Sequence, residues 1–483
     1  MSIAEEKIEI ITNEEWLSSL KTRVAETKWE GWCTDGPTIS KVPRIFQEVN
    51  PKAYEPKMVS LGPYHHRNIH LKAMEDLKWH YLQKFLGRNP GKSLEDYIEQ
   101  IKKRELLARM AYSEKVDMSS DEFAQMMLLD CCFVIEIIHS WKPFVEIKET
   151  VPTFRTRLPM SMHQTVGKGT EAVQNPNTST RYILPAIARD MLMLENQLPF
   201  FLLQTLFDSA YPDKSDLLKK HAFEFLGETF MNRKMKLASD NGDVYHLLHM
   251  LHFSISPPEK NRDDGEPFAF CWPLQSMKKS RHQPKDDLEG TDHQTRQLKW
   301  IPSATQLMEA GVHFRKKEKA TNLLDITFHN GVMEIALLQI DDSTETFLRN
   351  LIAFEQCSKN VSLHVTAYAA FMDCIINTAA DVALLQQHGI ILSGLGDGKQ
   401  VADLFNKLCK EVTLDYEKSY VSGIYKDVNK HWTNKYNQWR ARLNHDYFSN
   451  PWAIISVFAA ILLFGLAITQ TIYSALSYVR PPN

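Results

Sequence analysis

Two adjacent histidines, His65 and His66, follow a glycine-proline pair and carry rings that gain or lose a proton near neutral pH. In a cleft, such a ring could act as a general acid or base. In a tight loop, the same ring hydrogen-bonds to the backbone and takes part in no reaction. We expect the loop role for both histidines. Acid–base catalysis in a hydrolase or transferase is the alternative.

Glu195 is the only charged residue between positions 191 and 207, in a stretch that is otherwise largely apolar. A carboxylate is costly to bury without a partner, so this pattern predicts an ion pair or hydrogen bonds. We expect a structural role, in which the paired carboxylate holds a turn near Pro199. In the alternative, Glu195 serves with His65 and His66 at a catalytic site beside the GPYHH loop.

Three further motifs suggest chemistry but lack the features that it requires. The histidines of HLLHMLH (residues 246–252) recur at steps of three, yet no HExxH pattern or nearby acidic third ligand accompanies them. The segment GLGDGKQ (residues 394–400) has the wrong glycine spacing for a phosphate loop. Cys131 and Cys132 lie in an apolar run, so we expect buried thiols. We predict no catalytic, cofactor-binding or metal-binding residue.

The last element of the chain determines where any such site would be placed. No charged residue occurs from position 447 to 479, and IISVFAAILLFGLAITQTIY has no charged or strongly polar face. A helix of about 20 apolar residues spans the hydrocarbon core of a bilayer. Proline is tolerated at the first helical position, and aromatic rings favour the headgroup zone. We predict a single transmembrane helix over 451–478, with the anchor residues Pro451, Trp452, Leu462, Leu463 and Tyr473.

Basic residues are concentrated upstream of this helix and scarce downstream of it, where only Arg480 occurs. The positive-inside rule then places the large N-terminal part in the cytosol. The acidic N-terminus lacks the pattern of a secretory signal. We therefore expect a tail-anchored protein of the plasma membrane or an endomembrane. Its expected partners are the lipid bilayer and proteins of unknown identity.

Apolar residues recur at helical spacing through most of the chain, for example over 121–141 and over 184–206, where Pro199 interrupts the helix, so we predict a mainly α fold. Asn330-Gly331 between two apolar runs predicts a type I′ hairpin, a small antiparallel β element that makes the fold α+β. We divide the chain into an acidic leader (1–38), an N-terminal helical part (39–255), a flexible loop (256–297), a C-terminal part with the hairpin (298–424), an amphipathic juxtamembrane helix (425–450) and the transmembrane helix (451–478).

The juxtamembrane segment has one aromatic and apolar face, because such residues recur every three or four positions between 425 and 447. We expect this face to pack on the folded body. The alternative is an interfacial helix that lies on anionic lipid.

Composition excludes several classes of protein. The net charge of −3 provides no basic surface for a phosphate backbone, so we expect no nucleic acid partner. The 7 cysteines show no framework spacing, which predicts reduced thiols. The sequence contains no GxSxG, CxxC or dinucleotide fingerprint. We expect neither an enzyme nor a cofactor.

Several motifs follow one another in a fixed order: KVPRIFQEVNPKAYEPKMVSLGPYHH (41–66), RDMLMLENQLPFFLLQTLF (189–207), LLDITFHNGVMEI (323–335) and the apolar C-terminal stretch. Together they closely resemble the plant "domain of unknown function 247" family of membrane proteins. The resemblance covers nearly all of the chain from about residue 41. Two departures are Cys131, where the family usually has glycine, and Ala336, where proline is common.

The resemblance implies no particular activity, because most members of that family have none assigned. Relatives in grasses look like polymorphic pollen-side determinants of self-incompatibility, which implies recognition or signalling. Our hypothesis is a single-pass, membrane-anchored component of protein interaction or signalling. The alternative is an uncharacterised hydrolase or transferase with a site near the GPYHH loop.

Overall fold

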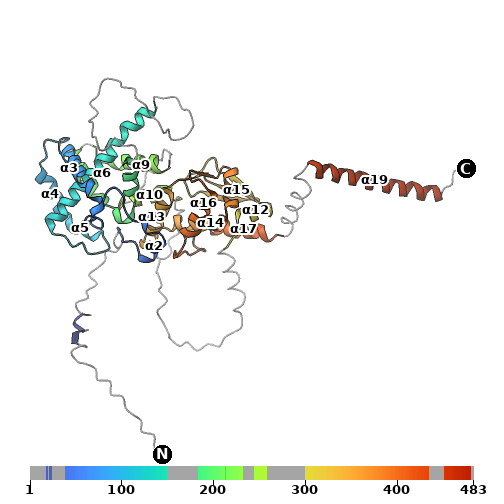
Figure 1. Ribbon diagram of the computed structural model, residues 1–483, viewed down its shortest axis with the longest axis horizontal. Helices are drawn as coiled ribbons and strands as arrows, with labels where there is room; N and C mark the ends of the chain where they lie inside the picture. Colours follow the sequence, from blue (N-terminus) through green and yellow to red (C-terminus); the bar gives the residue numbers. More distant parts are fainter. Residues whose placement is uncertain are drawn as a thin grey trace, which may run out of the picture.

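The structure is a computed structural model that describes residues 18–19, 21–23, 38–149, 183–212, 214–231, 244–257, 300–434 and 451–479. The predicted acidic leader, the predicted flexible loop and the segment 435–450 lie almost wholly outside these residues. The described body consists mainly of helices, as predicted, with two small sheets. Its N-terminal helices lie at one end and its C-terminal elements at the other (Figure 1).

Helix α6 (Ser120–Glu149) is the centre of the N-terminal part and packs against four other helices. Almost every residue from Phe123 to Ile138 is buried, because apolar residues occupy most of the circumference of the helix over this stretch. The surrounding helices are α3 (Glu75–Leu86), α4 (Leu94–Lys103), α8 (Phe200–Ala210) and α9 (Ser215–Met231). The remaining elements of this part are α2 (Arg44–Val49), η1 (Pro51–Ala53), η2 (Ile69–Met74), α5 (Glu105–Met110), α7 (Ile183–Asp190), η3 (Leu194–Asn196) and α10 (Leu247–Ile255).

The helix predicted over 184–206 is interrupted at Pro199, as expected, but the break is longer than predicted, because the chain divides there into α7, the 3₁₀ helix η3 and α8. Pro199 lies directly before α8, where proline cannot continue a preceding helix. Buried polar side chains of the intervening segment use the backbone groups that the break leaves free. Glu195 therefore lies on a short connecting turn and not on a long apolar helix.

The C-terminal part combines helices with two small sheets. Strand β2 (Ile326–His329) pairs antiparallel with β3 (Val332–Ile335) through the predicted turn, in which Asn330 and Gly331 have φ of 50° and 78°. The predicted antiparallel element is therefore present, but it belongs to a mixed sheet, because β1 (His313–Lys316) adds to β3 in parallel. A second, two-stranded sheet is also parallel and consists of β4 (Leu338–Ile340) and β5 (Ile391–Ser393). The helices are α12 (Ala304–Glu309), α13 (Thr344–Cys357), α14 (His364–Ile375), α15 (Ala379–Gln387), α16 (Gly398–Leu408) and α17 (Ser422–Thr433).

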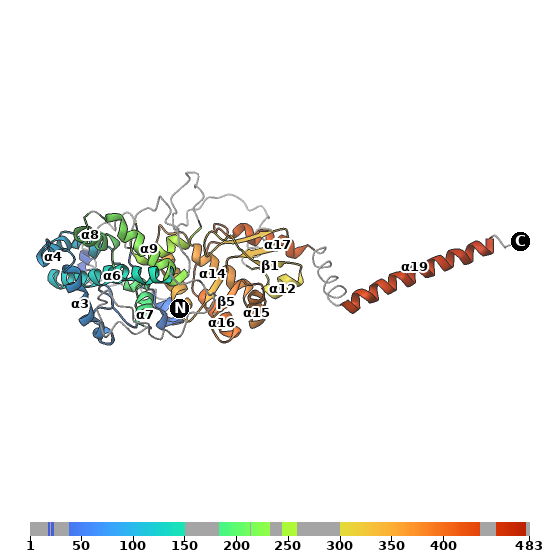
Figure 2. The same ribbon diagram turned by 90° about the horizontal axis from the view of Figure 1, so that it is seen from above.

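Helix α13 joins the two parts of the body. It contacts η1, η3 and α10 of the N-terminal part and α14 and α16 of the C-terminal part. Figure 2 shows α14 and α16 in the C-terminal part, with α6 and α9 in the N-terminal part beside it. The buried Asn350 side chain accepts a hydrogen bond from Leu194 N at 2.9 Å and donates one to Ala53 O at 2.8 Å. These contacts connect residues nearly 300 positions apart in the sequence, so the two parts share one core.

The beginning of the juxtamembrane segment packs on the body. Helix α17 buries Tyr425 and Val428 completely, and Trp432 packs against the same core. The lysines of this helix, Lys426 and Lys430, are exposed. Within α17 the apolar face thus faces protein and not lipid.

Helix α19 (Pro451–Val479) is one helix of 29 residues, and its window Phe458–Ala475 is long and apolar enough to cross a membrane. None of this window is buried against any described part of the chain. The apolar helices α14 and α15 differ in this respect, because most of their large apolar residues lie in the core. Length and composition therefore make α19 a candidate membrane span.

Candidate functional site

The segment over residues 57–62 crosses the N-terminal part outside any helix or sheet, so its backbone needs other hydrogen-bond partners. Asp190, the last residue of α7, supplies one carboxylate oxygen to three successive N–H groups. The distances to its Oδ2 are 2.9 Å from Lys57 N, 2.5 Å from Met58 N and 3.1 Å from Val59 N. The carboxylate thus satisfies three backbone donors that the bend at Lys57 and Met58 directs toward one oxygen.

The buried side-chain amides of Asn196 and Gln197 also hydrogen-bond to backbone groups. Asn196 accepts from Leu61 N at 2.7 Å and donates to Val59 O at 3.0 Å. Gln197 accepts from Leu248 N, in the first turn of α10, at 3.0 Å. Each amide also donates to a backbone carbonyl at the end of α7, namely Asp190 O for Asn196 and Met191 O for Gln197. The same side chains thus satisfy backbone groups at the helix break and in the segments that pack against it.

A buried ion pair holds the end of the segment. Asp130 accepts from Gly62 N at 2.8 Å, and its other oxygen lies 2.6 Å from Lys78 Nζ. Lys78 is fully buried and also donates to Ser60 O at 2.7 Å and to Glu75 at 2.7 Å. Gly62 has φ of 72°, and a Cβ there would lie 2.8 Å from the Tyr112 hydroxyl, so only glycine fits.

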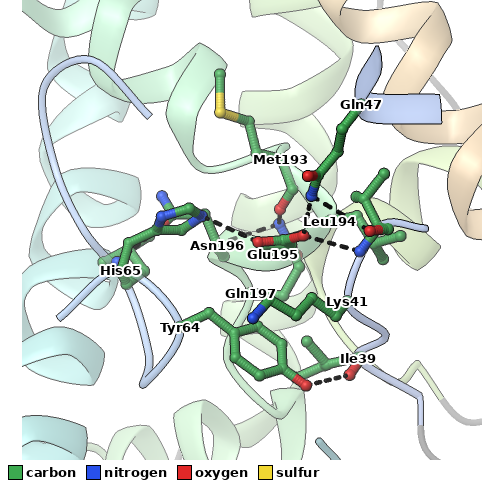
Figure 3. Close-up of polar contacts among 12 residues, drawn as sticks. Ile39, Lys41, Gln47, Tyr64, His65, Met193, Leu194, Glu195, Asn196 and Gln197 are labelled. Carbon is green, nitrogen blue, oxygen red and sulfur yellow. Dashed lines mark hydrogen bonds and ion pairs between the residues drawn. The ribbon is translucent and has the colours of Figure 1, made fainter. Parts of the chain in front are cut away.

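Glu195 and His65, which we singled out from the sequence, lie side by side near these groups (Figure 3). We call the whole set of side chains the polar cluster: Lys78, Asp130, Asp190, Asn196, Gln197, Glu195 and His65. Glu195 Oε1 accepts from Val42 N at 2.8 Å and from Gln47 Nε2 at 3.1 Å. Its Oε2 lies 3.5 Å from His65 Nε2, which makes no aligned hydrogen bond within the described part of the chain. The carboxylate thus holds the segment around Val42, whereas we expected it to hold a turn near Pro199.

Burial acts on the two groups in opposite ways. It lowers the pKa of His65 to about 4, helped by the positive charge of Lys41, so this ring is neutral at pH 7. It raises the pKa of Glu195, while the N–H of Val42 opposes that change. A neutral imidazole beside a carboxylate is compatible with positioning and also with proton transfer. The hydrogen bonds alone do not require catalysis.

His66 lies apart from this pair, at a shallow hollow of about 140 Å³. The hollow is lined by the GPYHH loop from Pro63 to Arg67, without His65, and by residues 114–118. Neither His65 nor Glu195 lines it. Of the three residues proposed for a catalytic site, only His66 therefore lines this hollow.

The three histidines of HLLHMLH are engaged in packing and hydrogen bonds. His246 Nδ1 accepts from His249 N at 3.1 Å and so caps α10, while Nε2 lies 3.0 Å from Thr38 O. His249 Nδ1 accepts from Tyr245 N at 3.1 Å. His252 Nε2 lies 2.6 Å from a carboxylate oxygen of Glu355 on α13. No group of three potential metal ligands occurs among the residues that the structure describes.

Acid is expected to destabilise the body through the buried ring of His246. Burial lowers the pKa of His246 from 6.5 to about 3, and the ring must stay neutral at Nδ1 to cap α10. Because the unfolded chain takes up this proton first, stability is lost as pH falls from 6.5 toward about 3. By pH 5 the loss is about 2 kcal/mol for this group.

The variant His246→Asn keeps a capping oxygen but does not titrate in this range. Denaturant unfolding of both proteins at pH 7.5 and pH 5 measures the effect. We expect the variant to lose about 2 kcal/mol less than the wild type between the two pH values. An equal loss in both proteins would contradict this role of His246.

The sequence interpretation missed most of the cluster. Asp190, Asn196 and Gln197 follow one another closely but contact segments more than 50 positions away. The sequence did contain an indication of two other residues of the cluster. Asp130 interrupts a long apolar run, and Lys78 lies on the apolar face of α3. Charged residues at such positions indicate buried pairs.

Comparisons with known proteins agree with these motifs. UPF0481 protein At3g47200 of Arabidopsis thaliana is 29% identical over 451 residues, which cover 92% of this chain and 87% of that protein. Putative UPF0481 protein At3g02645 of the same plant is 24% identical over 473 residues, covering 90% and 89%. No solved structure matches this chain.

The matched region includes every segment of the polar cluster. A family model described as "plant protein of unknown function" matches residues 39–466, which begin at Ile39 and end within α19. The chain therefore belongs to the plant domain of unknown function 247 family.

Proposed function

We propose that this protein is a single-pass membrane protein whose helical body binds protein partners and catalyses no reaction. The observation that carries the proposal is the uncovered apolar window of α19 beside a body with a complete core of its own. Exposed apolar residues on this scale are costly in water and favourable in a bilayer. The anchor brings the body to a membrane surface, where recognition takes place.

The polar cluster supports the proposal of a binding protein, because its side chains hold the backbone in place. Its carboxylates and amides are occupied by backbone N–H groups at 2.5 to 3.1 Å, which fixes the path of the segment over residues 57–62. Likewise, one carboxylate oxygen of Glu195 accepts hydrogen bonds from Val42 N and from the side chain of Gln47. Buried groups committed in this way make the interior rigid and hold the surface above it in one shape, which suits recognition of a partner.

Topology decides which proteins the body meets. The exposed lysines of α17 precede the span, and the positive-inside rule then favours a cytosolic body. Protease added to sealed vesicles should destroy a tag at the N-terminus and leave a tag at the C-terminus intact. Protection of the N-terminal tag would contradict the cytosolic placement.

Partners can be sought from the same membrane. A labelling enzyme fused to the N-terminus should mark a reproducible set of proteins that a variant lacking α19 does not mark. Failure to recover such a set would count against the interaction proposal. The family resemblance adds recognition between reproductive tissues as one setting in which to perform the experiment.

One observation favours the alternative, an unrecognised hydrolase or transferase. His65 Nε2 lies 3.5 Å from Glu195 Oε2, close enough for proton transfer after a small movement. If the pair is catalytic, His65→Gln should abolish turnover in a screen of ester and glycosyl substrates while the fold persists. Under our proposal the purified protein shows no turnover that this substitution removes.

A further inference from the structure

We propose that the body lies against the membrane through the solvent-exposed side of α17, and that this side binds anionic lipid headgroups. Three exposed residues, Trp300, Lys426 and Lys430, form what we call the headgroup face. The inference rests on the proposed membrane anchor and adds to it the orientation of the body. It starts from an aromatic ring and two positive charges at the end of the body from which the chain continues toward α19.

Trp300 exposes a large aromatic side chain beside α17. It is 71% exposed, whereas Trp79 is 49% exposed and Trp432 packs against the core. The backbone carbonyl of Trp300 accepts a hydrogen bond from Asn429 Nδ2 at 3.4 Å, which places it next to the second half of α17. Tryptophan combines an apolar ring with one N–H donor, and for that reason it is enriched in the headgroup zone of membranes.

The two lysines lie on the side of α17 that adjoins this contact. Around a helix of 3.6 residues per turn, Lys426 lies about 60° and Lys430 about 100° from Asn429, in the same direction. Asp427, the one acidic residue of α17, lies about 160° from Asn429, on the far side of the lysines. Both lysines are exposed, and neither forms an ion pair with a residue that the structure describes. Their charges are therefore available to phosphate groups.

The chain itself keeps this end of the body near the bilayer. The body ends with α17 and Asn434, and 16 residues (435–450) separate it from α19. A segment of this length reaches at most about 60 Å when fully extended. Tethering of this kind gives lipid a high effective concentration at the headgroup face, so weak attractions are sufficient. Helices α4 and α5 lie at the other end of the body (Figure 1).

Anionic lipid is the occupant that the charges favour. The 16 residues before α19 add three basic residues, Lys435, Arg440 and Arg442, against one acidic residue, Asp446. Each lysine or arginine close to an anionic membrane surface adds to the attraction. The cytosolic leaflet, which the proposed topology puts next to the body, carries such lipids.

The test uses the full chain reconstituted in vesicles of phosphatidylcholine and phosphatidylserine. A photoreactive benzoylphenylalanine in place of Trp300 should form lipid adducts on illumination. The same photoreactive residue in place of Leu106 should form few or none. Leu106 is a matched position, because it is 76% exposed and lies on α5 at the other end of the body.

Charge reversal tests the chemistry of the headgroup face. In the variant Lys426→Glu with Lys430→Glu, lipid adducts at position 300 should fall about tenfold, because attraction to anionic lipid becomes repulsion. Vesicles of phosphatidylcholine alone should lower the adducts of the chain with both lysines by a similar factor. The control Lys92→Glu with Lys103→Glu reverses two exposed lysines beside or within α4 and should leave the adducts unchanged.

Flotation of each variant with vesicles is measured in the same samples. A chain that does not float would overturn the anchor, and the orientation with it. A chain that floats but forms no more lipid adduct at position 300 than at position 106 would overturn the headgroup face and leave the anchor intact. Adducts to a second copy in place of lipid would overturn the choice of lipid as the occupant. Adducts that persist after charge reversal and in phosphatidylcholine alone would overturn the recognition of anionic headgroups.

Discussion

Replacing Asp190 with alanine should cost the body about 3–5 kcal/mol, because hydrogen bonds to a buried charge are among the strongest in a protein. The substitution would leave the N–H groups of Lys57, Met58 and Val59 without their acceptor. Folded domains are stable by only about 5–15 kcal/mol, so the loss is a large share of the total. Denaturant unfolding of the purified body and variant measures it.

Two matched substitutions separate this role from a general effect of charge. Asp190→Asn keeps one oxygen acceptor and should lose about 1–2 kcal/mol. Asp427→Ala removes an exposed carboxylate on α17 and should change stability by about 0.5 kcal/mol or less. If Asp190→Ala were as harmless as Asp427→Ala, the cluster would not hold the segment as we describe.

Introducing arginine at both Leu462 and Leu463 should release the protein from membranes. Both side chains are more than half exposed and lie within the apolar window of α19. Each charge near the centre of a span costs about 3 kcal/mol by the scale of membrane insertion, so the pair costs about 6 kcal/mol. Flotation of vesicles after expression of the full chain measures the bound fraction.

The control for this experiment is Leu462→Ala with Leu463→Ala. It shortens the same two side chains but keeps the window free of charge, so the chain should still float with vesicles. If the double arginine variant floated equally well, α19 would not enter the hydrocarbon core. The body would then bind membranes by another surface.

The sequence was sufficient for elements whose signal is local. Helix α19 follows from an unbroken apolar composition, and the β2–β3 hairpin follows from Asn330-Gly331, which favours positive φ at both turn residues. The parallel pairing of β1 with β3, and of β4 with β5, was not predicted. Parallel partners are joined through intervening helices or loops, and no short motif encodes their register.

The candidate site was predictable only in part, for a similar reason. The apolar surroundings of Glu195 indicated a partner, and His65 lies 3.5 Å away. The contacts of Asp190 and Asn196 join positions more than 130 residues apart, and the break between α7 and α8 brings them together. From the sequence, Pro199 was interpreted as an interruption within one helix. The polar residues before it were therefore not recognised as hydrogen-bond partners of the distant segment over residues 57–62.

The most direct test of the account is the sedimentation of the full chain with membranes washed at alkaline pH. Such washing removes proteins held on the surface and leaves helices that span the bilayer. We predict that the full chain stays in the pellet and that a chain lacking Pro451–Val479 moves entirely to the supernatant. Recovery of the full chain in the supernatant, or of the shortened chain in the pellet, would contradict the central claim.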